Sequence, residues 1–329
     1  MIKAIYTINN NYKYEYDVNK IIELSNKNFE MIWLDVHIEN SELKNKEILL
    51  LHKYFRFHEL SIEDCIFKKK YPKIEEFKNY IFSTTHGVQL KSDCFSEFRN
   101  SIYELNIFIG NNFVVTVHEE ELFFLESIFE KAKIKPLIEI KSLKNLIYKI
   151  FNEVVASYDY ALNKIDSTLN NIENGILKKP GTNNIESILN VKKMIFFLKK
   201  IAEQQHIVYN YFTKANNLIT TEYLVYFQDI YAQSTRLNQA ILIRSQMVIS
   251  LLDVYISSIN LQLSEIMKYL TIIATILMPV LIVSGYYGMN VLFPEYLLIG
   301  KEGTWFLAMI LMFCSTSISF IYFKKKKWL

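Results

Sequence analysis

The sequence predicts an α/β domain, then long helices, then two membrane-spanning helices at the C-terminal end. Three observations lead to this fold class. β-Branched and aromatic runs mix with helical stretches over residues 1–140, apolar residues recur at helical spacing over 141–268, and uncharged apolar runs cover 269–287 and 304–323. Of the 329 residues, 51% are hydrophobic and 22% are charged, and nearly all of the charge precedes the first apolar run. This division predicts a charged, cytoplasmic part and a membrane part.

Within residues 1–140, runs rich in β-branched and aromatic residues predict strands. These runs cover 30–38, 79–90, 101–110 and 112–119. The Gly-Asn-Asn triplet at 110–112 predicts a hairpin turn. The segment 58–67 predicts a helix, with Ser61 as its N-cap. The acidic run at 118–122 predicts a solvated helix start.

Long helices follow from residue 141 to residue 268. Apolar residues recur every three or four positions over 142–178, and the Pro-Gly pair at 180–181 breaks the pattern. A second helix is expected over about 184–217. A third begins near Glu222 and meets no helix breaker before Pro279, which is far longer than an ordinary globular helix. Two helices joined by an unmarked kink are the alternative.

The two apolar runs are each long enough to span a bilayer. About 20 residues of helix measure roughly 30 Å, the thickness of the hydrocarbon core. A short outer loop over 288–303 joins the runs. The tail 324–329 carries four consecutive lysines, which places it in the cytoplasm by the positive-inside rule. Two spans then place the N-terminus in the cytoplasm as well, and its first residues show no signal peptide. The lysines are also candidates for a basic collar at the inner mouth: Lys324, Lys325, Lys326 and Lys327.

Several function classes find no support in the sequence. The net charge of +3 and the absence of a basic platform with interleaved aromatic residues argue against nucleic-acid binding. No nucleophile–base set indicates an enzyme, and no organic cofactor motif is present. Cys65, Cys94 and Cys314 form no disulfide or zinc pattern. The histidines show no ligand spacing and are expected at the surface or in the core; they are His37, His52, His58, His86, His118 and His206.

One face of the long third helix, where it continues into the first apolar run, mixes polar, small and flexible apolar residues, whereas the other faces are rich in Ile and Val. We call this face the mixed stripe; it comprises Ser264, Met267, Leu270, Ala274, Met278, Leu281 and Gly285. A lipid-facing side is uniformly apolar, so the mixed stripe predicts contact with protein or water. One helix cannot line a pore, so a pore requires a homo-oligomer. Simple helix–helix packing, which also favours small residues, remains open.

A short polar motif follows the first run directly. Gly288, Met289 and Asn290 form it, and Glu295 lies just beyond. Magnesium dehydrates reluctantly, so neutral amide oxygens suit a hydrated ion that must bind weakly and leave again. Glu295 would attract cations from outside. An ordinary glycine C-cap followed by a turn asparagine explains the same three residues.

The motif and its context resemble the CorA family of magnesium/cobalt transport proteins. Tyr-Gly-Met-Asn at 287–290 follows the first of two C-terminal spans, the loop contains Pro-Glu, and the chain ends in lysines. The segments 60–82, 226–233, 251–260 and 264–290 are also similar to the family. The resemblance covers most of the chain and is most specific after residue 224.

The resemblance implies a funnel-shaped homopentamer in the plasma (inner) membrane, with five first spans around the pore and five second spans outside. It implies influx of hydrated divalent cations through the lipid bilayer, with magnesium as cargo and cobalt and nickel as further candidates. The membrane potential would drive entry, and cytoplasmic magnesium would close the pore.

Residue roles follow from the same resemblance. Asn290 would form the selectivity ring, shaped by Gly288 and Met289. The residues of the mixed stripe would line the pore, with hydrophobic constrictions at Met267, Leu270 and Met278. Three acidic residues would bind regulatory metal or ring the inner mouth: Asp229, Asp93 as a candidate partner from the neighbouring subunit, and Asp253.

Two positions depart from the family pattern, because Leu281 and Ser264 stand where some members have threonine and asparagine. Both changes put the number of internal ion sites in doubt. A zinc transporter of the same superfamily, with or without proton coupling, is one alternative. The mixed stripe lacks Cys and His, which argues against zinc. A membrane-anchored sensor or scaffold is the other alternative; it needs two spans but neither the stripe nor the motif.

Overall fold

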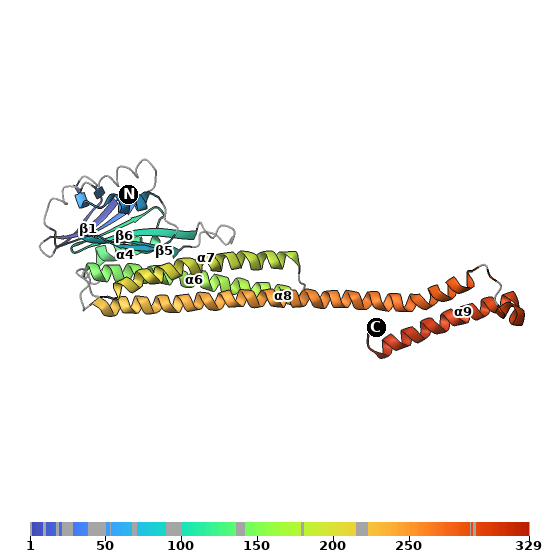
Figure 1. Ribbon diagram of the computed structural model, residues 1–329. Coiled ribbons are helices and arrows are strands. Elements are labelled where there is room, and N and C mark those ends of the chain that lie inside the picture. The colour runs from blue at the N-terminus through green and yellow to red at the C-terminus, as the bar shows by residue number, and fades with distance from the viewer. Residues whose placement is uncertain are drawn as a thin grey trace. The chain divides into compact units, whose positions relative to one another are not determined.

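Two compact units, Met1–Leu252 and Asp253–Leu329, make up the chain. The computed structural model describes residues 2–8, 11–17, 20–21, 29–38, 51–52, 54–67, 71–89, 101–135, 142–178, 181–214, 223–289, 291 and 294–328 (Figure 1).

A seven-stranded sheet forms the centre of the first unit. Its strand order is β2-β1-β3-β7-β6-β5-β4; β3 and β7 are parallel, and the other neighbours are antiparallel. The strands are β1 (Ile2–Ile8), β2 (Asn11–Glu15), β3 (Met31–His37), β4 (Lys73–Glu76), β5 (Tyr80–Val88), β6 (Ile102–Gly110) and β7 (Phe113–His118). The four strands predicted from composition are β3, β5, β6 and β7. The predicted hairpin turn joins β6 to β7 after the pair Ile109–Val114.

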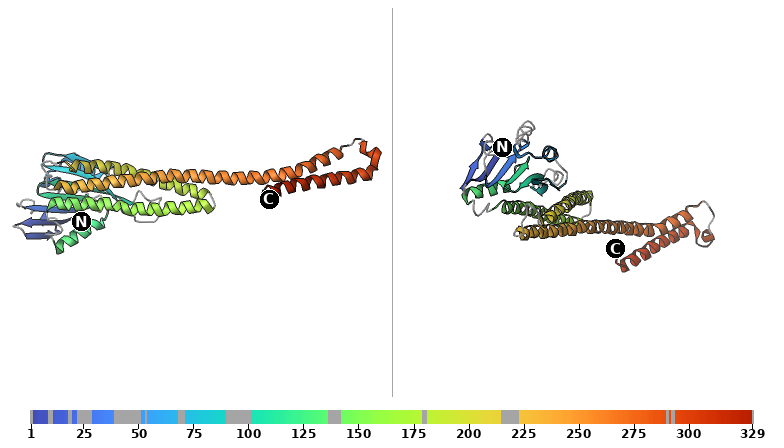
Figure 2. Two further views of the ribbon diagram at one scale, coloured as in Figure 1. Left: turned by 90° about the horizontal axis from the view of Figure 1, so that it is seen from below. Right: turned by 60° about the vertical axis from the view of Figure 1, so that its left-hand side comes forward.

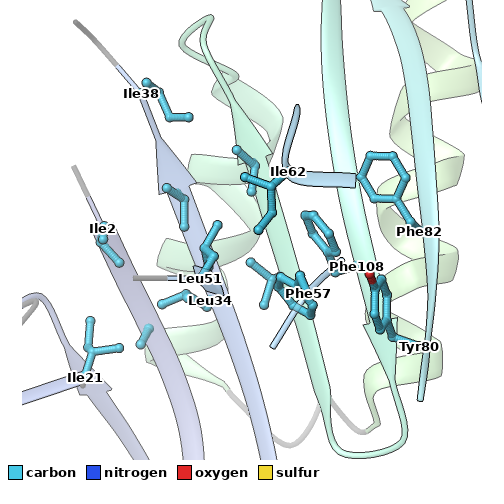
Figure 3. Close-up of a cluster of buried hydrophobic side chains, with 14 residues drawn as sticks. Ile2, Ile21, Leu34, Ile38, Leu51, Phe57, Ile62, Tyr80, Phe82 and Phe108 are labelled. Carbon is cyan, nitrogen blue, oxygen red and sulfur yellow. The ribbon is translucent and has the colours of Figure 1, made fainter. Parts of the chain in front are cut away.

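One face of the sheet packs against α3 (Glu59–Ile66) and the segment before it. Figure 3 shows Leu34, Phe82 and Phe108 of the sheet converging with Phe57 and Ile62. The ring of Phe57 stacks on Phe108, with centroids 4.0 Å apart. Because β-branched and aromatic residues alternate along the strands, this part of the face is apolar, and polar side chains such as Thr84 and Asn106 follow further along β5 and β6.

The predicted N-cap of α3 is wrong. The helix begins at Glu59, and His58 caps it by accepting the Leu60 N–H at Nδ1, 3.2 Å away. Ser61 lies inside the first turn, where its hydroxyl donates to the His58 carbonyl oxygen at 2.8 Å. The Tyr80 hydroxyl accepts the His58 N–H at 2.8 Å and so fixes the start of the helix from β5.

The opposite face of the sheet is covered by α4 (Phe123–Ile134), α6 (Leu143–Lys178) and α7 (Thr182–Phe212). Tyr158 of α6 donates to the His86 carbonyl oxygen at 2.8 Å, and Gln205 of α7 accepts the His86 N–H at 3.0 Å. Helix α7 ends before the expected residue 217.

A charged pair ties α6 to α8 (Leu224–Tyr287) within the first unit. Arg244 Nε donates to Asp166 Oδ1 at 2.8 Å, and Nη2 donates to Oδ2 at 2.5 Å. This two-bond geometry is the favoured arrangement of a guanidinium and a carboxylate.

The second unit consists of the later part of α8 and of α9 (Pro294–Lys325). Helix α8 is a single helix of 64 residues with Pro279 inside it, so the single-helix interpretation holds. Helix α9 breaks at Gly300, whose φ of 72° lies in the left-handed region that favours glycine. Within the described residues, α8 and α9 are the helices long and apolar enough to cross a membrane. Only 6% and 11% of the residues in their most apolar stretches are buried, which is unlike the core helix of a soluble protein.

We predict that Phe57→Ala destabilises the first unit, because it removes the ring stacked on Phe108. The expected loss is about 3–5 kcal/mol of unfolding free energy, as for other buried aromatic residues. Urea denaturation of the purified full chain in detergent, followed by tryptophan fluorescence, measures it. Phe67→Ala is the matched control, because Phe67 is 62% exposed and its loss should change stability by less than about 0.5 kcal/mol. Equal effects of the two changes would contradict the assigned core.

Candidate functional site

The membrane segment of α8 has one covered side. Within 269–287 the residues that are buried or half-buried are Ile272, Ile276, Pro279, Val280, Val283 and Tyr287. They recur every three or four positions and therefore share one face of the helix. Helix α9 runs back alongside this segment in every view (Figures 1 and 2). The covered face is thus the face that turns toward α9.

The mixed stripe lies on the other side of α8. All seven of its residues are exposed in the single chain. Ile276 stands two positions from both Ala274 and Met278, and two residues span about 200° around an α-helix. The same spacing separates Ile272 from Ala274. The mixed stripe therefore points away from α9, where a second copy of the chain or water can meet it.

The hydroxyl groups along this part of α8 donate to their own helix. Ser264 Oγ donates to the Asn260 carbonyl oxygen at 2.9 Å, and Thr271 Oγ1 donates to that of Met267 at 2.7 Å. Their oxygen lone pairs stay available. Pro279 has no N–H, so the Thr275 carbonyl oxygen lacks its usual helical donor. The mixed stripe itself offers the Ser264 hydroxyl oxygen, flexible apolar groups and no charge, which suit a hydrated cation better than a bare one.

The motif at 288–290 begins where α8 ends. The Gly288 N–H donates to the Ser284 carbonyl oxygen at 2.8 Å. A Cβ at position 288 would lie 2.7 Å from that oxygen, so the glycine is required by close approach of the backbone. Met289 is exposed. Asn290, the proposed selectivity residue, lies outside the described residues.

Asp229 of α8 is held by neutral donors from two helices. Tyr148 of α6 donates to Asp229 Oδ2 at 3.2 Å, and Gln233 donates to the same oxygen at 2.8 Å. Gln233 also donates to Asn152 Oδ1 at 3.2 Å. Burial, and then the charge of Asp229, raises the pKa of Tyr148. Both bonds fall on one oxygen, which fixes the orientation of the carboxylate.

Sequence reasoning missed Tyr148 and Gln233. Gln233 follows Asp229 by four positions, so helical spacing could have found it. Tyr148 stands 81 residues from Asp229, and no local signal connects them.

The other predicted charged residues belong to different elements. Asp253 is exposed on α8 in the second unit, Glu295 lies in the first turn of α9, and Asp93 lies outside the described residues. Lysines 324–327 are exposed at the end of α9 and just beyond. Among the residues that the structure covers, no three His, Cys, Asp or Glu side chains gather as a metal site.

Comparison with known proteins identifies the family. Residues 28–325 match the model of the CorA-like Mg2+ transporter protein family. The cobalt/magnesium transport protein CorA of Thermotoga maritima is 29% identical over 285 residues, covering 84% of this chain and 78% of that protein.

Two solved structures share the fold. The complete CorA magnesium transporter from Methanocaldococcus jannaschii matches with a TM-score of 0.82 at 22% identity, covering 100% of this chain and 99% of that one. The ZntB cytoplasmic domain from Vibrio parahaemolyticus matches with a TM-score of 0.62 at 12% identity, covering 78% of this chain and 97% of that one. Since the family model spans nearly the whole sequence, this chain belongs to the CorA-like Mg2+ transporter protein family.

Proposed function

We propose that this chain forms a channel through which hydrated Mg2+ enters the cell across the inner membrane. Membership of the family supports divalent-cation transport, and the name of the Thermotoga relative supports magnesium and cobalt as cargoes. The observation that carries the proposal is the uncharged mixed stripe, which faces away from α9 and ends at the Gly-Met-Asn motif. Nickel is a further candidate cargo, and both chain ends lie in the cytoplasm.

A homo-oligomer is part of the proposal, and we expect five copies. The geometry of one chain supports an inner ring of α8 segments with α9 outside, because the mixed stripe and the face toward α9 are on opposite sides of the same helix. In that arrangement Met267, Leu270 and Met278 form apolar constrictions, which close by excluding water. Leu281 adds a further apolar ring. The threonine that some family members have at this position would instead hydrogen-bond to the ion's hydration water.

The membrane potential is sufficient to drive entry. Moving one charge through 100 mV releases about 2.3 kcal/mol, so a divalent ion gains about 4.6 kcal/mol, or more than a thousandfold in concentration. Asn290 oxygens would hold the hydrated ion, and Glu295 would raise the local cation concentration outside. The lysines at 324–327 would form a basic collar at the inner mouth.

The regulatory part of the proposal is that cytoplasmic magnesium closes the pore. We assign Asp229 a bridging role, with Asp93 of the neighbouring subunit as the candidate partner and Asp253 as a second acidic ring. Bound Mg2+ would join the carboxylates, and its loss would leave like charges that repel and loosen the ring. Tyr148 and Gln233 already occupy one oxygen of Asp229, so the other is the expected metal ligand.

We predict that Asn290→Ala lowers magnesium entry into liposomes by about tenfold or more, because it removes the amide ring and so at least about 1.4 kcal/mol of binding. An internal magnesium dye reports entry under an imposed negative-inside potential. Asn171→Ala, at an exposed position of α6, is the matched control and should conduct as the unmodified protein does.

Other outcomes of this assay separate the alternatives. Zinc entry tied to a proton gradient, without magnesium entry, would favour a zinc transporter. No flux of any ion in a folded, oligomeric preparation would favour an anchored sensor or scaffold.

Asp229→Ala is expected to leave the pore open when internal magnesium is high, because one side of the metal bridge is gone. Uptake should then lose most of its dependence on magnesium trapped inside the liposomes. Asp159→Ala on the exposed side of α6 serves as the comparison and should retain that dependence. Unchanged inhibition in the Asp229 variant would remove this residue from the regulatory site.

Cysteine labelling tests which face of α8 lines the pore. In a background without native cysteines, Met278→Cys should react with a water-soluble thiol reagent and lose conduction on labelling. Ile272→Cys should stay unlabelled, because Ile272 is 3% exposed on the face toward α9. Labelling at 272 but not at 278 would mean that the faces have been assigned the wrong way round.

A further inference from the structure

A buried charged pair lies in the first unit, away from the proposed pore. The run at 118–122 does not begin a helix: His118 ends β7, and α4 starts at Phe123. The side chains of His118 and Asp35 are only 5% and 9% exposed, and His118 Nε2 lies 3.2 Å from Asp35 Oδ1. The other ring nitrogen, Nδ1, lies 2.6 Å from the Glu120 carbonyl oxygen. Nδ1 faces the Glu120 carbonyl oxygen, and Nε2 lies at ion-pair distance from Asp35 without the alignment of a hydrogen bond. With one acceptor at each nitrogen, this geometry favours the charged imidazolium.

Asp35 is fixed from the same two strands. Thr116 Oγ1 donates to Asp35 Oδ1 at 2.5 Å, and Trp33 Nε1 donates to Thr116 Oγ1 at 3.1 Å. Burial alone would raise the pKa of Asp35, but the charge of His118 and the hydrogen bond from Thr116 hold it below its ordinary value. The carboxylate therefore stays charged when the pair is closed.

The neighbouring His37 ring makes a second contact with residues 119–122, the loop that leads from β7 to α4. The rings of His37 and His118 stack with centroids 5.0 Å apart, and His37 Nε2 lies 3.2 Å from the Glu119 carbonyl oxygen. Successive carbonyl groups of the loop that leads to α4 are thus held by imidazole rings from β3 and β7.

Water has access to the pair from one side. A cavity of about 290 Å3 opens there, and its charged or titratable lining includes Lys3 of β1, Asp35, His37 and His118, with Glu121 and Glu126 toward α4. Lys3 pairs with Glu126. This cavity gives protons a path to the pair.

The other side of His118 is closely packed. A space of only about 20 Å3 separates it from Cys65 of α3, Glu104 of β6, and Glu119 and Glu120 of the loop. Asp35 is the acidic residue whose charge raises the pKa of His118.

We propose that His118 and Asp35 form a proton-operated latch that fastens the loop 119–122, and with it α4, to the sheet. A neutral imidazole has one N–H and can serve only one of its two acceptors. When His118 loses a proton to water in the cavity, one of its ring nitrogens keeps only a lone pair. That lone pair repels the oxygen it faces, which is either the Glu120 carbonyl oxygen or the buried Asp35 carboxylate. The loop then loses the fixed contact between the Glu120 carbonyl oxygen and the His118 ring, and the first turns of α4 loosen with it. Apolar contacts such as Phe129 with Trp33 keep the rest of the helix on the sheet.

The pH window follows from the direction of each shift. Burial and the charge of Lys3 would lower the pKa of His118, but the charge of Asp35 and the Glu120 carbonyl oxygen raise it above 6.5. Its stabilising contribution is fully present below pH 6.5 and is lost as pH rises through the raised pKa. The contribution of Asp35 is present above pH 3.8 and is lost as pH falls through its lowered pKa. The latch therefore closes near neutral and mildly acidic pH and opens toward alkaline pH.

Hydrogen exchange on the full chain in detergent tests the latch. Between pH 6 and 9, after correction for the intrinsic rate, peptides covering residues 119–135 should lose protection. The loss should reach up to about tenfold per pH unit between the unfolded and folded pKa values of His118. His118→Gln should exchange fast at every pH, without a step. His206→Gln, which replaces a half-buried histidine bonded to Ser234, is the control and should keep the step.

Asp35→Asn provides a second test that does not depend on the stability of the His118 variant. Without the carboxylate charge, the pKa of His118 should fall, so the step in exchange should move to lower pH. A step that persists in His118→Gln, or that does not move in Asp35→Asn, would overturn the latch. A flat profile in the unmodified protein would do the same.

Discussion

Every backbone polar group of α8 that enters the membrane must find its partner inside the protein, because hydrocarbon offers none. This constraint governs what the helix can present on its surface. The hydroxyls of Ser264 and Thr271 donate to carbonyl groups of their own helix, so only their oxygens remain for other contacts. Pro279 frees one carbonyl group in the same segment. A surface built in this way carries neutral oxygens and no charge.

A second consequence of the constraint is the division of α8 into two sides. The side of α8 toward α9 consists mainly of its own Ile and Val side chains, and Ile272 is almost completely buried. All seven residues of the mixed stripe are exposed to solvent in the part of the chain that the structure describes. A helix with one satisfied side and one exposed side of mixed polarity is an incomplete structure. In the proposed assembly, several copies complete this structure and together enclose an uncharged path.

The sequence predicted elements well where the signal is local. Strand composition, helical periodicity and the two apolar runs depend on neighbouring residues, and each was recovered as a strand or helix. The failures share a physical cause, because each depends on a residue far away in the chain. Tyr80 fixes the start of α3, Tyr148 holds Asp229, and Asp35 buries His118 from another strand. The glutamates at 119–121 are exposed or half-buried, but nothing local reveals that His118 pairs with an aspartate on the neighbouring strand β3. The break at Gly300 has a different cause, because a glycine alone does not predict a left-handed backbone.

The parallel pairing of β3 with β7 also has a consequence for how the chain folds. The hydrogen-bonded side chains of Trp33 and Thr116 stand 83 residues apart, so the middle of the sheet closes a long loop. Such non-local pairing is slow to form. During synthesis β1, β2 and β3 leave the ribosome well before their partner, and the β3 edge stays unpaired until β7 emerges. Since α8 and α9 follow later still, the sheet has time to close before the apolar helices are made. The order of elements along the chain thus separates the two steps most prone to aggregation.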